Sequence, residues 1–474
     1  MNYVFYDFET SGTNRYFDQP IQIAAICVDE TFEINSELTL NETCKLKDGV
    51  VPHPQALLVN KIDIDTLKNG QSFYDMIDKV QKKFTEWSPA IFIGYNSLFF
   101  DEVVLRQSLY QSLHDPYLTN TNNNRRADLY HIFLGLSKLR PDIIKLGINP
   151  ETEKESFKLE YLAKANKIEQ EKAHDALSDV VATIGLAKLI KEKAPDYWDH
   201  CMHISNPENF RTYLEKQDLF FKAPSHPSHV ITPIKFLSEN PERNKELSFF
   251  DLKFDPENYI DKKSVEIMSL IESKEKVIKL IEINKSPIIL GEEFISHEIF
   301  EDNEIKDFKS RIESLKIHES FLDRLRQALV DRSQDREVNF PMPEWVETQI
   351  YAAFANAKDK EKMKTFRNTT DPEEKNKLAK DFEDQRYREL AYRILFNESR
   401  NFLDEDKVTD RELFFAERAL GTDQGVKWCT ISKAKKDIDN LRENSQYSEY
   451  LDYIDQIKNF IDEEEIKYKK YQKS

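Results

Sequence analysis

The chain has 474 residues, of which 39% are hydrophobic and 32% are charged. It is too apolar for a disordered chain and long enough for two or three domains of about 150 residues each. The formal net charge is −18, from 68 Lys and Arg against 86 Asp and Glu, which argues against nucleic-acid binding through bulk positive charge.

Two further features bear on the compartment. No stretch approaches about 18 uninterrupted apolar residues, and the first residues have no basic segment ahead of an apolar core, so we expect neither a membrane helix nor a secretory signal. The four cysteines are widely spread and form no Cys-x-x-Cys pair. We therefore expect no zinc site and no disulfide framework, and a reducing, cytoplasmic setting.

The first 200 residues alternate strand-like and helix-like patterns. Strands are predicted at residues 3–8, 22–29, within 31–46 and at 90–95, and helices at 73–87, 101–113 and 176–190. The last helix is marked by a stripe of apolar residues that recur at helical spacing. Strands mixed with helices predict an α/β sheet domain.

The pattern changes after residue 194. Five prolines between residues 195 and 233 predict a linker, and short strands at 230–236, 247–252, 277–283 and 288–290 predict a small β-rich module with helices to about residue 335. From residue 341 onward only charged helical patterns remain. The predicted domains are 1–196, 202–338 and 342–474.

A pair of carboxylates lies on the first predicted strand. Asp7 and Glu9 are two residues apart, so they point to the same face of the strand. An Asp-x-Glu pair on a solvated edge is common and carries no chemistry, but this strand is flanked by Val4, Phe5 and Phe8. Two carboxylates in an apolar setting repel each other unless a cation lies between them, and hard oxygen ligands favour magnesium or manganese.

Two later segments supply matching groups. Asp101 opens a predicted helix, where an acid can also serve the helix dipole, as could its neighbour Glu102. Asp175 is a predicted N-cap, which leaves His174 just outside the helix and Asp179 one turn inside it. A histidine beside a carboxylate on a rigid helix suits a general base next to a metal ligand, although a single histidine before a helix is more often a surface residue.

In chain order these residues read Asp-x-Glu, Asp and His-x-x-x-x-Asp, which resembles the proofreading-type 3′→5′ exonuclease superfamily with four acids and a histidine. Longer segments resemble bacterial exonuclease I; they are residues 6–10, 93–96, 100–102, 157–166, 173–176, 283–287 and 395–402. The resemblance spans nearly the whole chain. It implies a ribonuclease H-like exonuclease domain, an SH3-like domain and a C-terminal helical domain around a DNA strand.

The resemblance also implies an activity: degradation of single-stranded DNA from its 3′ end to 5′-mononucleotides, in DNA repair and recombination. Asp7, Glu9, Asp101 and Asp179 would hold two Mg²⁺ ions, or Mn²⁺ in their place, about 3.5–4 Å apart, and His174 would be the general base. The strand would be held by residues that include the metal ligand Glu9; the others are Lys158, Arg106 and Tyr117. The resemblance further implies a partner, single-stranded DNA-binding protein, and we expect a monomer.

Departures from the family concern substrate affinity. Residues 118–124 lack the tryptophans that relatives can carry there for stacking on bases, and stacking is worth about 1–3 kcal/mol per base. Lys158 stands where better-known relatives have arginine, and the chain is shortened between residues 236 and 247. Two other functions stay open: an exoribonuclease of the same superfamily, and a single-strand-binding protein on an inactive nuclease domain.

Overall fold

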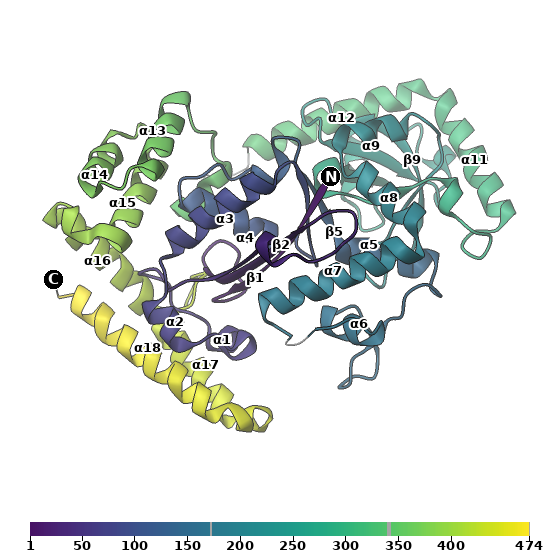
Figure 1. The fold of residues 1–474 in the computed structure, drawn as a ribbon. Helices are drawn as coiled ribbons and strands as arrows, with labels where there is room; N and C mark the ends of the chain where they lie inside the picture. Colours follow the sequence, from purple (N-terminus) through teal and green to yellow (C-terminus); the bar gives the residue numbers. More distant parts are fainter. Residues whose placement is uncertain (171–172, 339–342, 474) are drawn as a thin grey trace.

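The structure is a computed structural model and describes residues 1–170, 173–338 and 343–473 (Figure 1). Its first region contains a five-stranded sheet of order β3-β2-β1-β4-β5. The strands are β1 (Asn2–Thr10), β2 (Pro20–Val28), β3 (Thr39–Thr43), β4 (Ala90–Gly94) and β5 (Arg125–Asp128). β1 pairs antiparallel with β2 and parallel with β4, so the predicted α/β class is confirmed and its sheet is mixed.

Helices cover both faces of this sheet because β1 is apolar on both. Val4 and Tyr6 pack in one hydrophobic cluster with side chains of α3 and α4, and Tyr3 and Phe5 pack in another with α5 and α7. The helices of this region are α1 (Pro54–Asn60), α2 (Ile64–Asn69), α3 (Phe73–Trp87), α4 (Asp101–Gln111), α5 (Leu129–Leu139), α6 (Leu159–Ala165) and α7 (Ala176–Lys193). A short hairpin, β6 (Gly147–Ile148) with β7 (Glu155–Ser156), precedes α6.

The predicted linker at 194–233 is wrong, because its second half contains the strand β8 (Phe220–Lys222) and its first half is helical. Two helices occupy this first half, α8 (Pro195–Ile204) and α9 (Pro207–Leu214), with Trp198 and Phe210 fully buried. Pro195 and Pro207 lie in the first helical turn, where a missing N–H costs no hydrogen bond. These prolines therefore start helices, whereas the sequence pattern predicted a linker from them.

The predicted β-rich module is an antiparallel sheet of order β11-β10-β9-β8-β12. Its strands are β8 (Phe220–Lys222), β9 (Thr232–Glu239), β10 (Glu246–Asp251), β11 (Ile278–Glu282) and β12 (Ile289–Leu290). Three helices accompany it: α10 (Ser264–Glu272), α11 (Asp302–Ile317) and α12 (Glu319–Val338). The sheet lies to the right of the first region in Figure 1.

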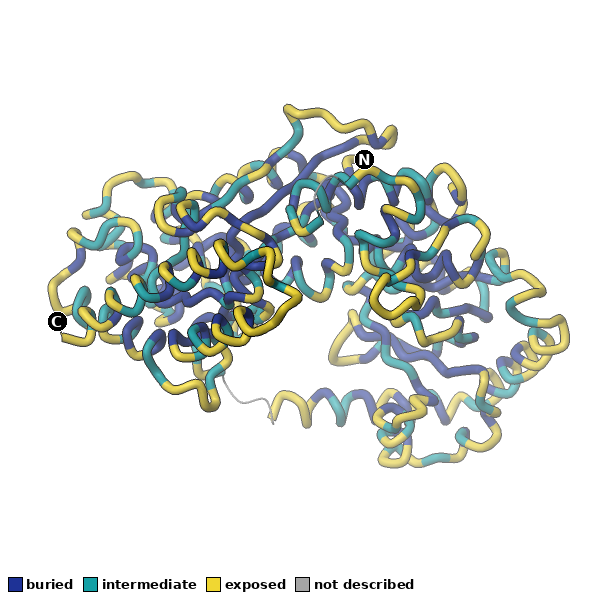
Figure 2. Tube along the Cα trace, turned by 90° about the horizontal axis from the view of Figure 1, so that it is seen from below, coloured by how far each residue is buried: buried dark blue, intermediate teal, exposed yellow. Residues whose placement is uncertain are grey.

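Between residues 343 and 473 the described chain is helical and contains no strand, as predicted. Its helices are α13 (Ala357–Asn368), α14 (Pro372–Asp381), α15 (Gln385–Ser399), α16 (Glu405–Leu420), α17 (Ile431–Glu443) and α18 (Leu451–Tyr471). α17 and α18 pack against α1, which anchors these helices on the first region (Figure 1). Figure 2 shows that buried residues concentrate inside each region and exposed ones on the outer loops and helix faces.

The first two regions share a core. One hydrophobic cluster contains Phe5 of β1, Trp198 of α8 and Leu290 of β12. Because this core crosses the predicted boundary near residue 200, the limits 1–196, 202–338 and 342–474 stay a prediction. The predicted boundary between 338 and 342 lies outside the described residues.

Candidate active site

The carboxylates of β1 lie where this strand outruns its neighbour. β1 pairs with β4 only from Asn2 to Phe5, so Asp7 and Glu9 lie beyond the end of β4. The period-two alternation puts them on the same face as Phe5, which is the face that α7 covers. The C-terminal end of β1 therefore places both acids on the side of the sheet that α7 covers.

Asp101 meets the same stretch of β1. It is the first residue of α4, 5% exposed, and its Oδ1 accepts the backbone N–H of Phe8 at 3.1 Å. That amide lies past the last β1–β4 pair, so the carboxylate satisfies a group that the sheet leaves open. This hydrogen bond holds the Asp101 carboxylate at Phe8, the residue between Asp7 and Glu9.

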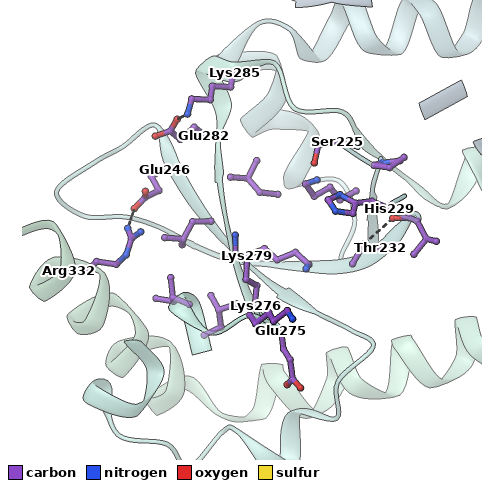
Figure 3. A pocket seen from close by; sticks show the side chains of 18 of the residues that line it. Ser225, His229, Thr232, Glu246, Glu275, Lys276, Lys279, Glu282, Lys285 and Arg332 are labelled. Carbon is purple, nitrogen blue, oxygen red and sulfur yellow. Dashed lines mark hydrogen bonds and ion pairs between the residues drawn. The ribbon is translucent and has the colours of Figure 1, made fainter. Parts of the chain in front are cut away.

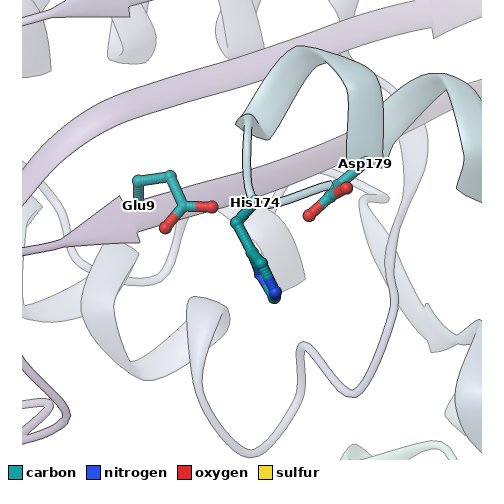
Figure 4. Close-up of side chains that lie close together, drawn as sticks. All are labelled: Glu9, His174 and Asp179. Carbon is teal, nitrogen blue, oxygen red and sulfur yellow. The ribbon is translucent and has the colours of Figure 1, made fainter. Parts of the chain in front are cut away.

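The third segment begins at the N-terminus of α7. Asp175 is the N-cap, as predicted, and its side chain accepts the N–H of Ser178. His174 precedes it in the left-handed backbone region (φ 62°), with a half-exposed side chain. One ligand atom each from Glu9, His174 and Asp179 lies within 4.8 Å of the others, and Figure 4 shows these three side chains grouped between β1 and α7.

The electrostatics of this group favour a bound cation. Burial raises the pKa of Asp7 well above its ordinary value, and the charges of Asp101, Glu9 and Asp179 raise it further. Burial also raises the pKa of Asp101 to about 7 and raises that of Asp179. Repelling oxygen donors of this kind fit a hard divalent ion, which would neutralise them.

Lys158 lies near His174, and Arg106 is bound to another side chain. The Lys158 Nζ is 3.8 Å from Glu160, whose other carboxylate oxygen is 4.0 Å from His174 Nε2. Arg106 donates from Nε to Glu102 at 2.7 Å, and its guanidinium carbon is 5.6 Å from the centre of the Tyr117 ring. Arg106 and Tyr117 therefore form one unit on α4 and the segment after it.

Sequence reasoning missed two neighbours of the group. Glu160 lies beside His174, and Gln170 donates to Asp179 at 2.6 Å. Glu160 belongs to the family-like segment 157–166, so its motif could have marked it. Gln170 lies outside those segments, and no residue pattern pointed to it.

Comparisons with known proteins identify the family of the chain. An exonuclease family matches residues 4–187, and the exonuclease I C-terminal domain matches residues 344–464. Exodeoxyribonuclease I of Buchnera aphidicola subsp. Acyrthosiphon pisum (strain APS) is 30% identical, over 85% of this chain and 97% of that protein. The Escherichia coli (strain K12) enzyme is 28% identical, over 84% and 85%.

Solved structures share the fold. Exonuclease I from Methylocaldum szegediense has a TM-score of 0.83 at 22% identity, over 98% of this chain and 99% of that one. E. coli exonuclease I in complex with a dA16 oligonucleotide has a TM-score of 0.81 at 23% identity, with the same coverage. No helix among the described residues is long and apolar enough to cross a membrane.

Fold and site together define a nuclease with a ribonuclease H-like exonuclease domain, and this domain implies dependence on a divalent metal ion. The chain belongs to the exodeoxyribonuclease I family.

Proposed function

We propose that this nuclease degrades single-stranded DNA from the 3′ end and releases 5′-mononucleotides, with Mg²⁺ as its metal. The observation that carries the reaction is the group of mutually repelling carboxylates beside a half-exposed histidine. The substrate is supported by family membership and by the oligonucleotides bound in the E. coli structures.

In the proposed mechanism, Asp7, Glu9, Asp101 and Asp179 would hold the metal ions. Bound there, the metal would polarise the phosphodiester and stabilise the leaving oxygen. His174 takes a proton from the attacking water while a water O–P bond forms. The bond from phosphorus to the 3′ oxygen of the preceding nucleotide breaks, and that oxygen leaves with a proton from solvent.

Neighbouring residues would prepare the substrate. Glu160 lies 4.0 Å from His174 Nε2 and can orient the imidazole, and the exposed Lys158 can meet a phosphate as a point charge. Tyr117 can stack on a base. Its ring centre is 6.0 Å from that of Phe354, which is 81% exposed and comes from the helical C-terminal region. These two rings offer a surface for stacking on bases, in place of the tryptophans that are missing from residues 118–124.

A basic cavity in the second region offers a path for the rest of the strand. It has a volume of about 810 Å³, and its lining includes Lys222, Lys274, Lys276 and Lys279. Figure 3 labels Lys276 and Lys279 among the side chains that line it. Burial and the charges of Lys279 and Lys276 together lower the pKa of Lys222 to about 8, so positive charge is crowded here in a protein of net charge −18. Such a cavity suits phosphates.

We expect Lys274→Glu with Lys276→Glu to weaken binding of a long single strand about tenfold or more at low salt. Both side chains are exposed, so folding should be unaffected. For every phosphate that the variant no longer neutralises, the slope of log K against log salt should become less negative by about 0.7. Fluorescence titration at several salt concentrations measures this.

The matched control is Lys360→Glu with Lys364→Glu, which makes the same charge change on exposed positions of α13. If both pairs weaken binding equally, the cavity is not the strand path. Hydrolysis of a short oligonucleotide that reaches only the active site should be unchanged in all variants.

The polarity test is a time course on 3′- and 5′-labelled single strands, duplex DNA and matched RNA, with Mg²⁺ and with a chelator. We expect mononucleotides first from the 3′ label, Mg²⁺ dependence, and little activity on blunt duplex. Faster loss of RNA would favour the exoribonuclease, and binding without hydrolysis would favour the non-catalytic protein. First release from the 5′ label would contradict the proposal.

The cellular role rests on the family resemblance alone. We propose a cytoplasmic monomer that acts in DNA repair and recombination and binds single-stranded DNA-binding protein. Co-purification with that protein, and the mass of the particle in solution, test the partner and the oligomeric state.

A further inference from the structure

Glu102, next to the candidate ligand Asp101, is the centre of a buried polar network. It is 2% exposed. Its carboxylate accepts hydrogen bonds from four side chains: Tyr6 Oη at 3.1 Å, Arg106 Nε at 2.7 Å, Thr119 Oγ1 at 2.7 Å and Arg126 Nη1 at 2.9 Å. A buried carboxylate with this many donors has one fixed orientation. The proposed mechanism assigns Glu102 no role.

The network lies beside Asp101 at the start of α4. α4 begins at Asp101, and Phe100, its N-cap, makes no side-chain cap hydrogen bond. The first turn of α4 is instead joined to β1 at two points, Phe8 N–H to Asp101 and Tyr6 Oη to Glu102. β1 also carries Asp7 and Glu9, so these contacts set the position of one carboxylate relative to the others.

The far side of the network belongs to the second region. Arg126 of β5 is 7% exposed and donates from Nη2 to the carbonyl of Asn284 at 2.6 Å, while its Nη1 holds Glu102. The Ser286 hydroxyl donates to the Arg126 carbonyl. Ser286 has φ 46°, an uncommon conformation for serine, so this turn is held in place by its contacts. One guanidinium thus joins the turn at 283–286 to the residue beside Asp101.

We propose that Glu102 and Arg126 are positioning residues that hold Asp101 for metal binding, and that the turn at 283–286 completes their support. This deepens the proposed function and rests on it for the identity of the reaction. Partners behind a metal ligand typically change metal affinity by about 10–100-fold when they are altered. The turn is continuous with the basic cavity, whose lining includes Glu282 and Lys285.

Two variants test the network from its two sides. Arg126→Lys keeps the charge beside Glu102, but an ammonium lacks the planar fork that bonds Glu102 and Asn284 together. Ser286→Ala removes only the hydroxyl from the second region. The control is Ser248→Ala, which removes a buried hydroxyl of the second sheet that donates to the Ser238 carbonyl at 2.8 Å and accepts the Ser238 N–H at 3.2 Å.

Mn²⁺ binding to the DNA-free protein is measured by electron paramagnetic resonance, alongside thermal unfolding and the Mg²⁺ concentration for half-maximal turnover. We expect Arg126→Lys to weaken Mn²⁺ binding about tenfold, with turnover at saturating Mg²⁺ within about twofold of wild type. Ser286→Ala should shift the same quantities in the same direction by a smaller factor. Ser248→Ala should bind Mn²⁺ as wild type does, whatever its unfolding temperature.

Wild-type Mn²⁺ affinity in both network variants, with only a lower unfolding temperature, would overturn the proposal. If Arg126→Lys does not fold, Ser286→Ala decides, because it leaves both charges in place. A wild-type protein that binds Mn²⁺ but does not degrade single strands would refute the proposed function, and the Mn²⁺ measurement would still decide the role of the network.

Discussion

Asp7→Asn should lower the rate of single-strand hydrolysis by about 10³-fold or more while DNA binding persists. Asp7 is the acid on which the charges of Asp101, Glu9 and Asp179 act together, so it is central to the metal group. Metal ions supply several kcal/mol of transition-state stabilisation, and about 4 kcal/mol corresponds to 10³-fold in rate. Asp179→Ala should behave in the same way. Single-turnover rates and separate DNA titrations measure the two properties.

Asp7→Asn, which should slow hydrolysis, should stabilise the fold of the metal-free protein. The pKa of Asp7 is higher in the folded protein than in the unfolded chain. The free energy of unfolding therefore falls as pH rises from the unfolded pKa to the folded pKa. Asp7→Asn should therefore raise the unfolding temperature in a chelator near pH 8 and remove most of the stabilisation by Mg²⁺. Exposed Asp142→Asn is the control. Loss of DNA binding together with hydrolysis, or near-normal turnover, would reject the ligand assignment.

Metal affinity should depend on pH for the same reason. A carboxyl must be ionised to bind a cation, and burial raises the pKa of Asp101 to about 7. Mn²⁺ affinity should therefore rise as pH increases through about 7, and Asp101→Asn should weaken binding and flatten this dependence. A wild-type affinity that is level from pH 5.5 to 8 would contradict this account of the group.

His174→Ala should slow turnover by about 10²–10⁴-fold, the usual range for a positioned acid–base group. The backbone at His174 is left-handed, a conformation that asparagine tolerates better than most residues. His174→Asn therefore keeps the loop and a hydrogen-bonding side chain but removes the base, so it separates chemistry from local structure. Single-turnover rates from pH 5.5 to 9 at saturating Mg²⁺ compare both variants with wild type.

Two outcomes would change the role of His174. A fast His174→Asn enzyme would leave it only a part in shaping the start of α7. Weaker Mn²⁺ binding in His174→Ala would make it a ligand, which its place within 4.8 Å of Glu9 and Asp179 permits. The sequence assigned it no ligand role, so the metal titration is the decisive measurement between base and ligand.

The sequence alone was sufficient for much of the first region. The alternation around Asp7 and Glu9 predicted β1 and the shared face of its acids, and Asp175 predicted the start of α7. These features depend on a local period or a local hydrogen bond, which residue order specifies directly. The carboxylates and the histidine were singled out because their order along the chain resembles that of the exonuclease superfamily, and their roles stay predictions.

Only the tertiary structure decided the features that depend on distant partners. β5 was missed because Arg125, Arg126 and Asp128 are polar, and Arg126 and Asp128 are buried only because Glu102, Asn284 and the backbone amides of residues 96 and 98 satisfy them. The same holds for Glu160 beside His174 and for the lysines that crowd one cavity. Whether a charge is buried, paired or repelled depends on groups that lie far away in sequence, and folding alone brings those groups together.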